Sequence, residues 1–346
     1  MKPLISSSNK NQLDSLVLLR GIAVLLVCFC HFARPLSQGH ALAGLFGWFD
    51  DYGRFGVHVF FVISGFVIPL SLWHGKYQIR DYGRFLYKRL LRLHPPYLAA
   101  LALTLLIMFF SYKVRHVAFP ESALSILQSM VYFHVPRDNQ VYWTLMVEAQ
   151  YYLFIGLFFS SLMAYPRVTL CVVTPILLAL TQVDLPFHIR LLSYLPFFLV
   201  GTIGFLIYTN HGKQVLNVAA LSAVLIFSFF VHALPAFVAT ITTVICIIGC
   251  RIRIPQILRF PGKISYSMYL IHIPIGIKFI NLAMRRLDPA YSGLLFLVTM
   301  IVLFVVSWLF YKIFEEFSEN LSRKIKYKAA RSVQVVKRDK DKMAVA

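Results

Sequence analysis

Long apolar runs separated by short polar segments recur along the whole chain. Ten runs have the character of membrane helices, since a helix needs about 20 mainly apolar residues to cross a bilayer. We expect helices rather than strands, because a helix satisfies its own backbone hydrogen bonds in lipid. The fifth and eighth runs are the shortest. The predicted spans are 15–33, 55–73, 96–112, 143–163, 168–181, 191–209, 215–231, 236–250, 264–281 and 291–314.

Composition agrees with this pattern. Of 346 residues, 59% are hydrophobic and 14% charged, whereas soluble domains carry about 25% charged residues. The mean hydropathy is +0.71. We therefore predict an all-α polytopic integral membrane protein. It would comprise a cytoplasmic segment 1–14, a transmembrane domain 15–317, and a basic tail 318–346 that is a short amphipathic helix followed by disorder.

The distribution of Lys and Arg predicts the orientation. With the N-terminus in the cytoplasm, the cytoplasmic segments hold 23 Lys/Arg and the external ones 8, which favours N-in/C-in. The net charge of +20 is then explained by basic loops and a tail facing anionic membrane lipids. A nucleic-acid partner would need a folded basic domain, and none is visible.

No metal site is predicted. The five cysteines lie in apolar runs without the His or Asp neighbours of a metal site, and small hydrophobic side chains are their ordinary role there. They are Cys28, Cys30, Cys171, Cys246 and Cys250.

Arg20 and His31 both lie in the first predicted span. Ionisable groups within spans are costly and are functional hypotheses by default. Eleven positions correspond to about 16 Å of helix and place both side chains on one face. Taken singly, Arg20 could snorkel to the inner rim and His31 could bond to a neighbour. Together they indicate a polar track through the span.

A second motif is FLYKRLLRLHPPYL, residues 85–98. Arg89 and Arg92 are three positions apart and share a helix face, and guanidinium groups bind phosphates bidentately. The alternative is ordinary positive-inside charge. Pro95 and Pro96 are expected to mark the start of the third span.

Two further spans carry polar groups. Glu148 lies in the fourth span near Trp143, and must be protonated or paired with a cation such as His31 or an arginine. In the ninth span a stripe of hydroxyls and an imidazole suggests either a site or polar contacts between helices. Its members are Ser265, Tyr266, Tyr269 and His272.

In this order, the motifs resemble the membrane acyltransferase-3 family over roughly residues 13–315. The stretch VFFVISGFVIPLSL, residues 59–72, is also similar to that family's second span. The motifs are Arg20-Gly21-x-Ala23…His31, Arg89-x-x-Arg92-x-x-Pro95, Trp143-Thr144-Leu145-x-x-Glu148 and Gly262-x-x-Ser265-Tyr266-x-x-Tyr269-Leu270-x-His272.

The resemblance implies transfer of an acyl group, usually acetyl from acetyl-CoA, to carbohydrate hydroxyls in the bacterial inner membrane. Acceptors in the family include exopolysaccharide, O-antigen, peptidoglycan and lipid-linked sugars. Some members carry an extra C-terminal hydrolase-like domain. We expect none here, so an acceptor that needs one would require a separate periplasmic or glycan-assembly protein.

By the same resemblance, His31 matches the essential histidine, Arg89 and Arg92 the paired arginines, and Glu148 the acidic residue. We expect the CoA phosphates on the paired arginines and Arg20. His31 would be the general base, with an acyl-imidazole as the alternative chemistry.

The remaining candidates have supporting roles in this hypothesis. Glu148 would hold the His31 tautomer, and Ser265 or Tyr266 would donate to the thioester oxyanion. Trp143, Tyr269 and His272 are further candidates for the substrate site.

Two other interpretations stay open at this point. The chain could be a polysaccharide or lipid transporter in which Arg20, His31 and Glu148 form the path, which predicts substrate movement without consumption of acyl-CoA. Within the enzyme class, another donor such as succinyl-CoA is an alternative to acetyl-CoA.

Overall fold

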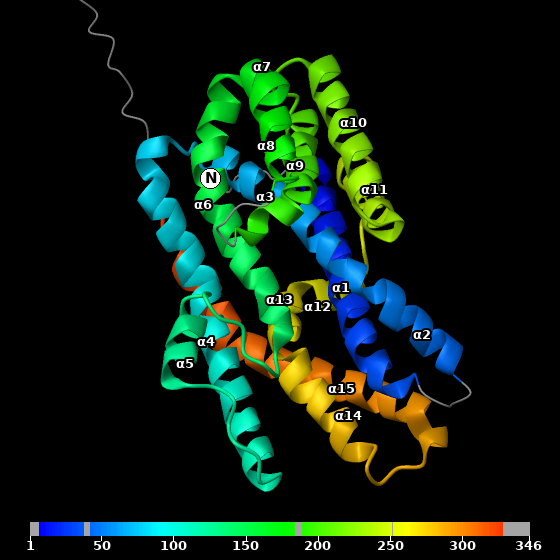
Figure 1. Cartoon of the computed structure of the whole chain (residues 1–346). Coiled ribbons are helices and arrows are strands. Elements are labelled where there is room, and N and C mark those ends of the chain that lie inside the picture. Colours follow the sequence, from blue (N-terminus) through cyan, green and yellow to red (C-terminus); the bar gives the residue numbers. More distant parts are fainter. Residues whose placement is uncertain (1–6, 38–41, 184–188, 251, 328–346) are drawn as a thin grey trace, which may run out of the picture.

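The computed structural model describes residues 7–37, 42–183, 189–250 and 252–327, and this part of the chain contains helices and no strand (Figure 1). Short 3-10 and π segments join several of the helices, among them η5 (His272–Ile277) and η7 (Tyr311–Glu315). The α-helices are α1 (Ser7–Leu36), α2 (Ala43–Tyr52), α3 (Gly56–His74), α4 (Tyr82–Val114), α5 (Ala123–Met130), α6 (Trp143–Ala164), α7 (Pro166–Val168), α8 (Thr174–Leu180), α9 (Arg190–Tyr208), α10 (Gln214–Val231), α11 (Leu234–Gly249), α12 (Gln256–Lys263), α13 (Ser265–Ile271), α14 (Lys278–Ala283), α15 (Ser292–Phe310) and α16 (Glu316–Arg323).

All ten predicted spans fall on helical segments, but within the described residues only seven helical stretches are long and apolar enough to cross a membrane. The fifth and eighth correspond to shorter apolar helices, Pro166–Leu180 and Leu234–Gly249. The ninth is divided into α13 and α14 by the π segment η5, which contains Pro274. A polytopic helical membrane protein is therefore supported, and the number ten remains a prediction.

The predicted helix boundary at Pro95 and Pro96 is wrong. Helix α4 continues through both prolines from Tyr82 to Val114, although each proline removes one backbone hydrogen bond from the helix interior. In this region the Tyr266 hydroxyl donates to the Leu93 carbonyl at 2.8 Å, which ties α4 to α13. The paired arginines and the third span consequently belong to one rigid helix.

Helix α1 lies at the centre of the packing and contacts α2, α3, α12 and α13. Two clusters of buried apolar side chains flank it. One joins α3, α6 and α9, and the other joins α1, α13, α15 and the second half of α4. The polar residues described below lie where these two clusters meet.

Two glycines allow unusually close helix contacts. A Cβ added to Gly201 of α9 would lie 2.1 Å from the Val62 carbonyl oxygen of α3, and one added to Gly262 of α12 would lie 1.9 Å from the Val17 carbonyl oxygen of α1. Small residues let helix backbones approach in this way in membranes. The Gly262 contact brings the start of α13 beside α1.

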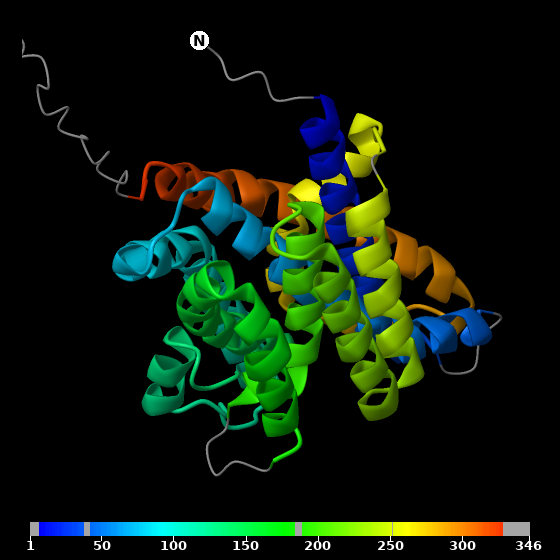
Figure 2. The ribbon, with the colours of Figure 1, turned by 90° about the horizontal axis from the view of Figure 1, so that it is seen from above.

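The end of the described chain packs back on the bundle. Helix α16 lies against α4, and in Figure 2 it forms the red end of the long segment that crosses the molecule. Helix α16 corresponds to the short amphipathic helix predicted near Ser318, although it begins slightly earlier, at Glu316. The predicted disorder of the basic tail concerns residues 328–346, which lie outside the described residues, as do residues 1–6.

Replacing Gly262 with Ala is expected to force α12 away from α1, because the added methyl group meets a backbone carbonyl. Overpacking of this kind costs about 1–3 kcal/mol, so the thermal unfolding midpoint in detergent should fall. The control is Gly249→Ala, where nothing lies within 4 Å of the new Cβ, and where Ala should be neutral or slightly stabilising in a helix. Equal midpoints for the two variants would contradict this description of the contact.

Candidate functional site

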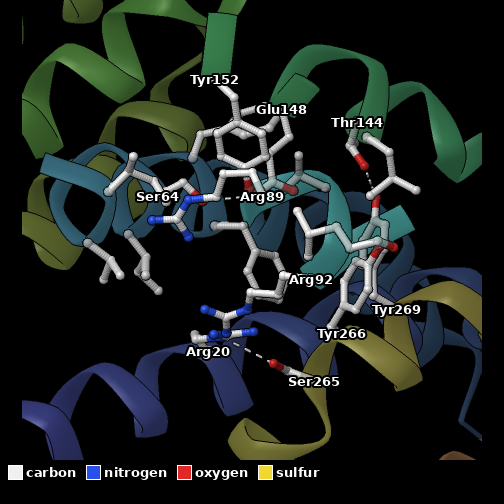
Figure 3. Close-up of a pocket in the computed structure, with 18 residues that line it drawn as sticks. Arg20, Ser64, Arg89, Arg92, Thr144, Glu148, Tyr152, Ser265, Tyr266 and Tyr269 are labelled. Atoms are coloured by element: carbon white, nitrogen blue, oxygen red, sulfur yellow. Dashed lines mark hydrogen bonds between the residues drawn. The ribbon is translucent and has the colours of Figure 1, made fainter. Parts of the chain in front are cut away.

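A cavity of about 120 Å³ lies where α1, α3, α4, α6 and α13 meet (Figure 3). Apolar side chains form part of its wall, and the rest is polar. The polar lining residues are Arg20, Ser64, Arg89, Arg92, Thr144, Glu148, Tyr152, Ser265, Tyr266 and Tyr269. We call this space the arginine cavity. It brings together seven of the candidates, which the sequence placed on three separate spans and on the segment before the third span.

Three guanidinium groups face the arginine cavity. Arg20 comes from α1, and Arg89 and Arg92 come from α4; Figure 3 shows their side chains directed into one space. Like charges at close range repel, and isolated charges are costly among apolar helices. The cluster is therefore suited to an anion that would neutralise it.

Arg89 is the most deeply buried of the three, with 6% of its surface exposed. Its guanidinium carbon lies 5.6 Å from the Phe85 ring centre and 5.7 Å from that of Tyr152, a cation–π arrangement. Its buried Nε has no hydrogen-bond partner. An unpaired buried N–H group is costly, so an acceptor oxygen from a bound anion would stabilise this side chain.

Ser265 positions Arg20. The Arg20 Nε donates to the Ser265 Oγ at 3.2 Å, and the Ser265 hydroxyl donates to the Gly262 carbonyl at 2.9 Å. The hydroxyl of Tyr266 likewise donates to the Leu93 carbonyl. Both protons are thus already engaged with backbone oxygens, and this arrangement does not support the predicted role of either residue as an oxyanion donor.

Glu148 does not contact His31 as predicted. Its carboxylate accepts hydrogen bonds from the Tyr152 hydroxyl and from the Ser64 hydroxyl, the latter at 3.5 Å. The sequence also predicted that Glu148 could pair with a cation such as an arginine. Its described contacts are instead with these two hydroxyl groups. The reason is geometric, because Glu148 lies on the part of α6 that faces the arginine cavity. Its negative charge there partly offsets the three guanidinium groups.

His31 instead packs against His272, with ring centres 5.3 Å apart. The Nδ1 of the fully buried His272 lies 2.7 Å from the Tyr269 carbonyl oxygen. A carbonyl only accepts, so Nδ1 carries the proton and Nε2 is the free acceptor. That Nε2 is buried without a hydrogen-bond partner. The two imidazoles form a second polar locus, which we call the histidine pair.

Local packing explains how the histidine pair forms. A Cβ on Gly276 would lie 2.1 Å from the Phe32 ring, so η5 can approach α1 only because residue 276 is glycine. This contact sets His272 against His31.

Tyr269 connects the two loci. Its side chain lines the arginine cavity, and its hydroxyl contacts Thr144 at 2.7 Å and the Val141 carbonyl at 3.1 Å. Its own carbonyl holds His272. One residue therefore contacts both the arginine cavity and the histidine pair.

Trp143 does not line the arginine cavity. Its ring packs against those of Tyr194, at 4.8 Å between centres, and Phe61, at 6.2 Å, so it supports the fold beside α6. Two residues that bond to Glu148, Ser64 and Tyr152, were not among the predicted site residues. The only available signal was a hydroxyl inside an otherwise apolar run.

Two more cavities adjoin the first. An apolar one of about 420 Å³ lies between α4 and α6 and shares Arg89, Glu148 and Tyr152 with the arginine cavity. A polar one of about 340 Å³ lies beneath α16 and shares Arg20 and Arg92 with it. The arginine cavity thus borders one apolar and one polar space.

In the described part of the chain, no three His, Cys, Asp or Glu side chains lie together in a way that could hold a metal ion. All five cysteines are free thiols.

Comparison with known proteins gives one match. A family model described as an acyltransferase domain, that of the acyltransferase-3 family, matches residues 13–313. The match includes every helix that contributes to the arginine cavity and the histidine pair. No curated protein and no solved structure matches the chain.

The arginine cavity should bind a compact polyanion. We expect the affinity for inorganic pyrophosphate in low salt to fall about tenfold or more in Arg89→Gln and in Arg92→Gln, because each loses a charge-assisted hydrogen bond. The control is Arg84→Gln, which lies outside the cavity and pairs with Asp81 at 3.8 Å. Calorimetry in nanodiscs measures the affinities, and three equal values would rule out an anion site here.

Proposed function

The chain belongs to the acyltransferase-3 family, and from this premise we propose that it is an integral-membrane O-acyltransferase. It moves an acyl group, acetyl in this proposal, from cytoplasmic acyl-CoA to a hydroxyl of a cell-envelope or exported carbohydrate. The observation that carries the proposal is the cluster of three arginines around a cavity, with the buried Arg89 Nε left without a partner.

Acyl-CoA fits this cluster chemically. The donor carries several phosphate oxygens, and guanidinium groups bind such oxygens in pairs. Arg20, Arg89 and Arg92 would hold the phosphorylated part, with Ser265 fixing Arg20. When bound, the donor supplies the activated acyl thioester.

His31 is the general base of the proposed reaction. It accepts the proton of the acceptor hydroxyl, a task suited to an imidazole. In this proposal His272 orients it by ring packing, with the two ring centres 5.3 Å apart, and the Tyr269 carbonyl holds His272 itself in place through Nδ1. In this mechanism His272 takes the positioning role that the sequence had suggested for Glu148. An acyl-imidazole on His31 is the alternative chemistry.

The two loci lie at different heights along α1. Arg20 and His31 are eleven residues apart, about 16 Å of helix rise. The long, thin arm of the donor therefore has to run along α1, past Tyr269, from the arginines to the histidine pair. This places the chemistry near the outer end of α1 in the N-in orientation, where an exported acceptor is accessible.

The apolar cavity supports a lateral route for the acceptor. Tyr87, Leu90 and Leu153 line it and are each about half exposed on two spanning helices, so they face lipid. A carbohydrate anchored to a hydrocarbon chain could enter there with its anchor in the bilayer. Of the acceptors named above, this feature favours lipid-linked sugars over exopolysaccharide, O-antigen and peptidoglycan. The proposed location is a bacterial inner membrane.

Turnover of acetyl-CoA tests the function. Purified protein in nanodiscs receives acetyl-CoA labelled on the acetyl group together with a membrane glycolipid extract, and release of CoA is followed. We expect His31→Ala to bind the donor but to lower kcat about 100-fold or more, while Arg89→Ala/Arg92→Ala loses donor binding.

The controls are His74→Ala, an exposed residue at the end of α3, and Arg84→Ala. Both should behave as wild type. If wild type binds no acyl-CoA of any chain length, and instead moves glycolipid between leaflets, the transporter interpretation replaces this one. Label retained on acid-quenched protein, and absent from His31→Ala, would indicate the acyl-imidazole route.

Blocking the apolar cavity tests the lateral route. Ala149 lines this cavity and not the arginine cavity, so Ala149→Trp should reduce transfer to lipid-anchored acceptors at least about tenfold while CoA affinity stays unchanged. Leu157→Trp is the matched control, since Leu157 is exposed on α6 and lines neither cavity. Normal transfer by Ala149→Trp would exclude entry between α4 and α6.

A further inference from the structure

The polar cavity beneath α16 borders the arginine cavity. It is lined by the start of α1, by α12, by η7 and by α16, and it shares Arg20 and Arg92 with the arginine cavity. Lys263 and Arg323 add two more basic side chains to its wall. Four cations around one polar space indicate an anionic ligand larger than a single phosphate.

Three carboxylates also line this space, and their contacts differ. Glu315 accepts from the backbone N–H and the hydroxyl of Ser267, so it anchors η7 to α13. Glu316 pairs with Lys312 on its own helical face at 2.9 Å. These two carboxylates already have local partners.

Glu319 is the carboxylate that faces the arginines. One of its oxygens lies 3.7 Å from Arg92 Nη2 and 3.1 Å from Arg323 Nη2. A carboxylate between two guanidinium groups occupies the place that a phosphate oxygen would take. The Arg92 contact is long for a charge-assisted bond, and Glu319 stays partly exposed, so the interaction is weak enough to be displaced.

We propose that the cavity beneath α16 binds the phosphorylated nucleotide end of the acyl-CoA donor, and that Glu319 occupies the phosphate position on Arg92 until the nucleotide displaces it. This inference rests on the proposed function and adds the place of the nucleotide to it. The diphosphate that joins the nucleotide to pantetheine then lies at Arg20 and Arg92, which the two spaces share, and within reach of Arg89. The pantetheine arm continues from there through the arginine cavity.

The proposal gives α16 a selective role. A ligand without the nucleotide gains nothing from Lys263 and Arg323 and does not need to displace Glu319. A ligand with the nucleotide gains contacts with both cations, but it must displace the Glu319 carboxylate. Removing Glu319 should therefore improve binding of CoA and leave binding of pantetheine unchanged.

Calorimetry in nanodiscs with CoA and, separately, with pantetheine tests this difference. We expect Glu319→Gln to tighten CoA binding roughly threefold to tenfold, because the competing charge is gone. Lys263→Gln should weaken CoA binding by a similar factor, and neither variant should change the affinity for pantetheine. The matched control is Asp51→Asn, which neutralises an exposed carboxylate that lies 3.7 Å from Arg54 and lines none of the three cavities, and which should leave both affinities at the wild-type value.

Thermal unfolding of the variants checks that α16 stays in place, and equal midpoints for Glu319→Gln and the wild type are expected. CoA binding by wild type that does not tighten in Glu319→Gln, or a change that is equal for CoA and pantetheine, overturns this inference and leaves the proposed function intact. Failure of wild type to bind any acyl-CoA overturns both.

Discussion

The cost of holding positive charge among apolar helices governs this structure. Arg20, Arg89 and Arg92 meet at one cavity, where repulsion and lost hydration both oppose folding. The surrounding contacts limit that cost: aromatic faces beside Arg89, a hydroxyl on Arg20, and the carboxylate of Glu148 across the space. The compensation is incomplete, since the Arg89 Nε remains unpaired, and an anionic ligand is what would complete it.

Two polar loci lie along one helix. Helix α1 carries Arg20 at the arginine cavity and His31 at the histidine pair. Helix α13 begins with Ser265, which contacts Arg20, and is followed directly by His272, which packs against His31. Two close contacts through Gly262 and Gly276 hold the segments together at these two heights. Arg20 with Ser265 and His31 with His272 thus form two separate loci on the same pair of segments.

The sequence predicted the helical class, the position of all ten helical segments and most of the polar residues of the arginine cavity, because hydropathy and polar residues in or beside apolar runs are local signals. It failed where long-range packing decides. Helix α4 passes through Pro95 and Pro96, and Glu148 bonds to Tyr152 and not to His31. Neither the hydrogen bond from Arg20 to Ser265 nor the pairing of His31 with His272 follows from spacing, since both depend on how segments more than 200 residues apart meet.

A cryo-EM map of the protein in nanodiscs with CoA bound would test the central claim most directly. The account predicts phosphate density within hydrogen-bonding distance of Arg89 or Arg92, with the pantetheine arm running along α1 toward His31. Density for CoA on a surface remote from all three arginines, with the cavity still holding an unpaired Arg89, would contradict it.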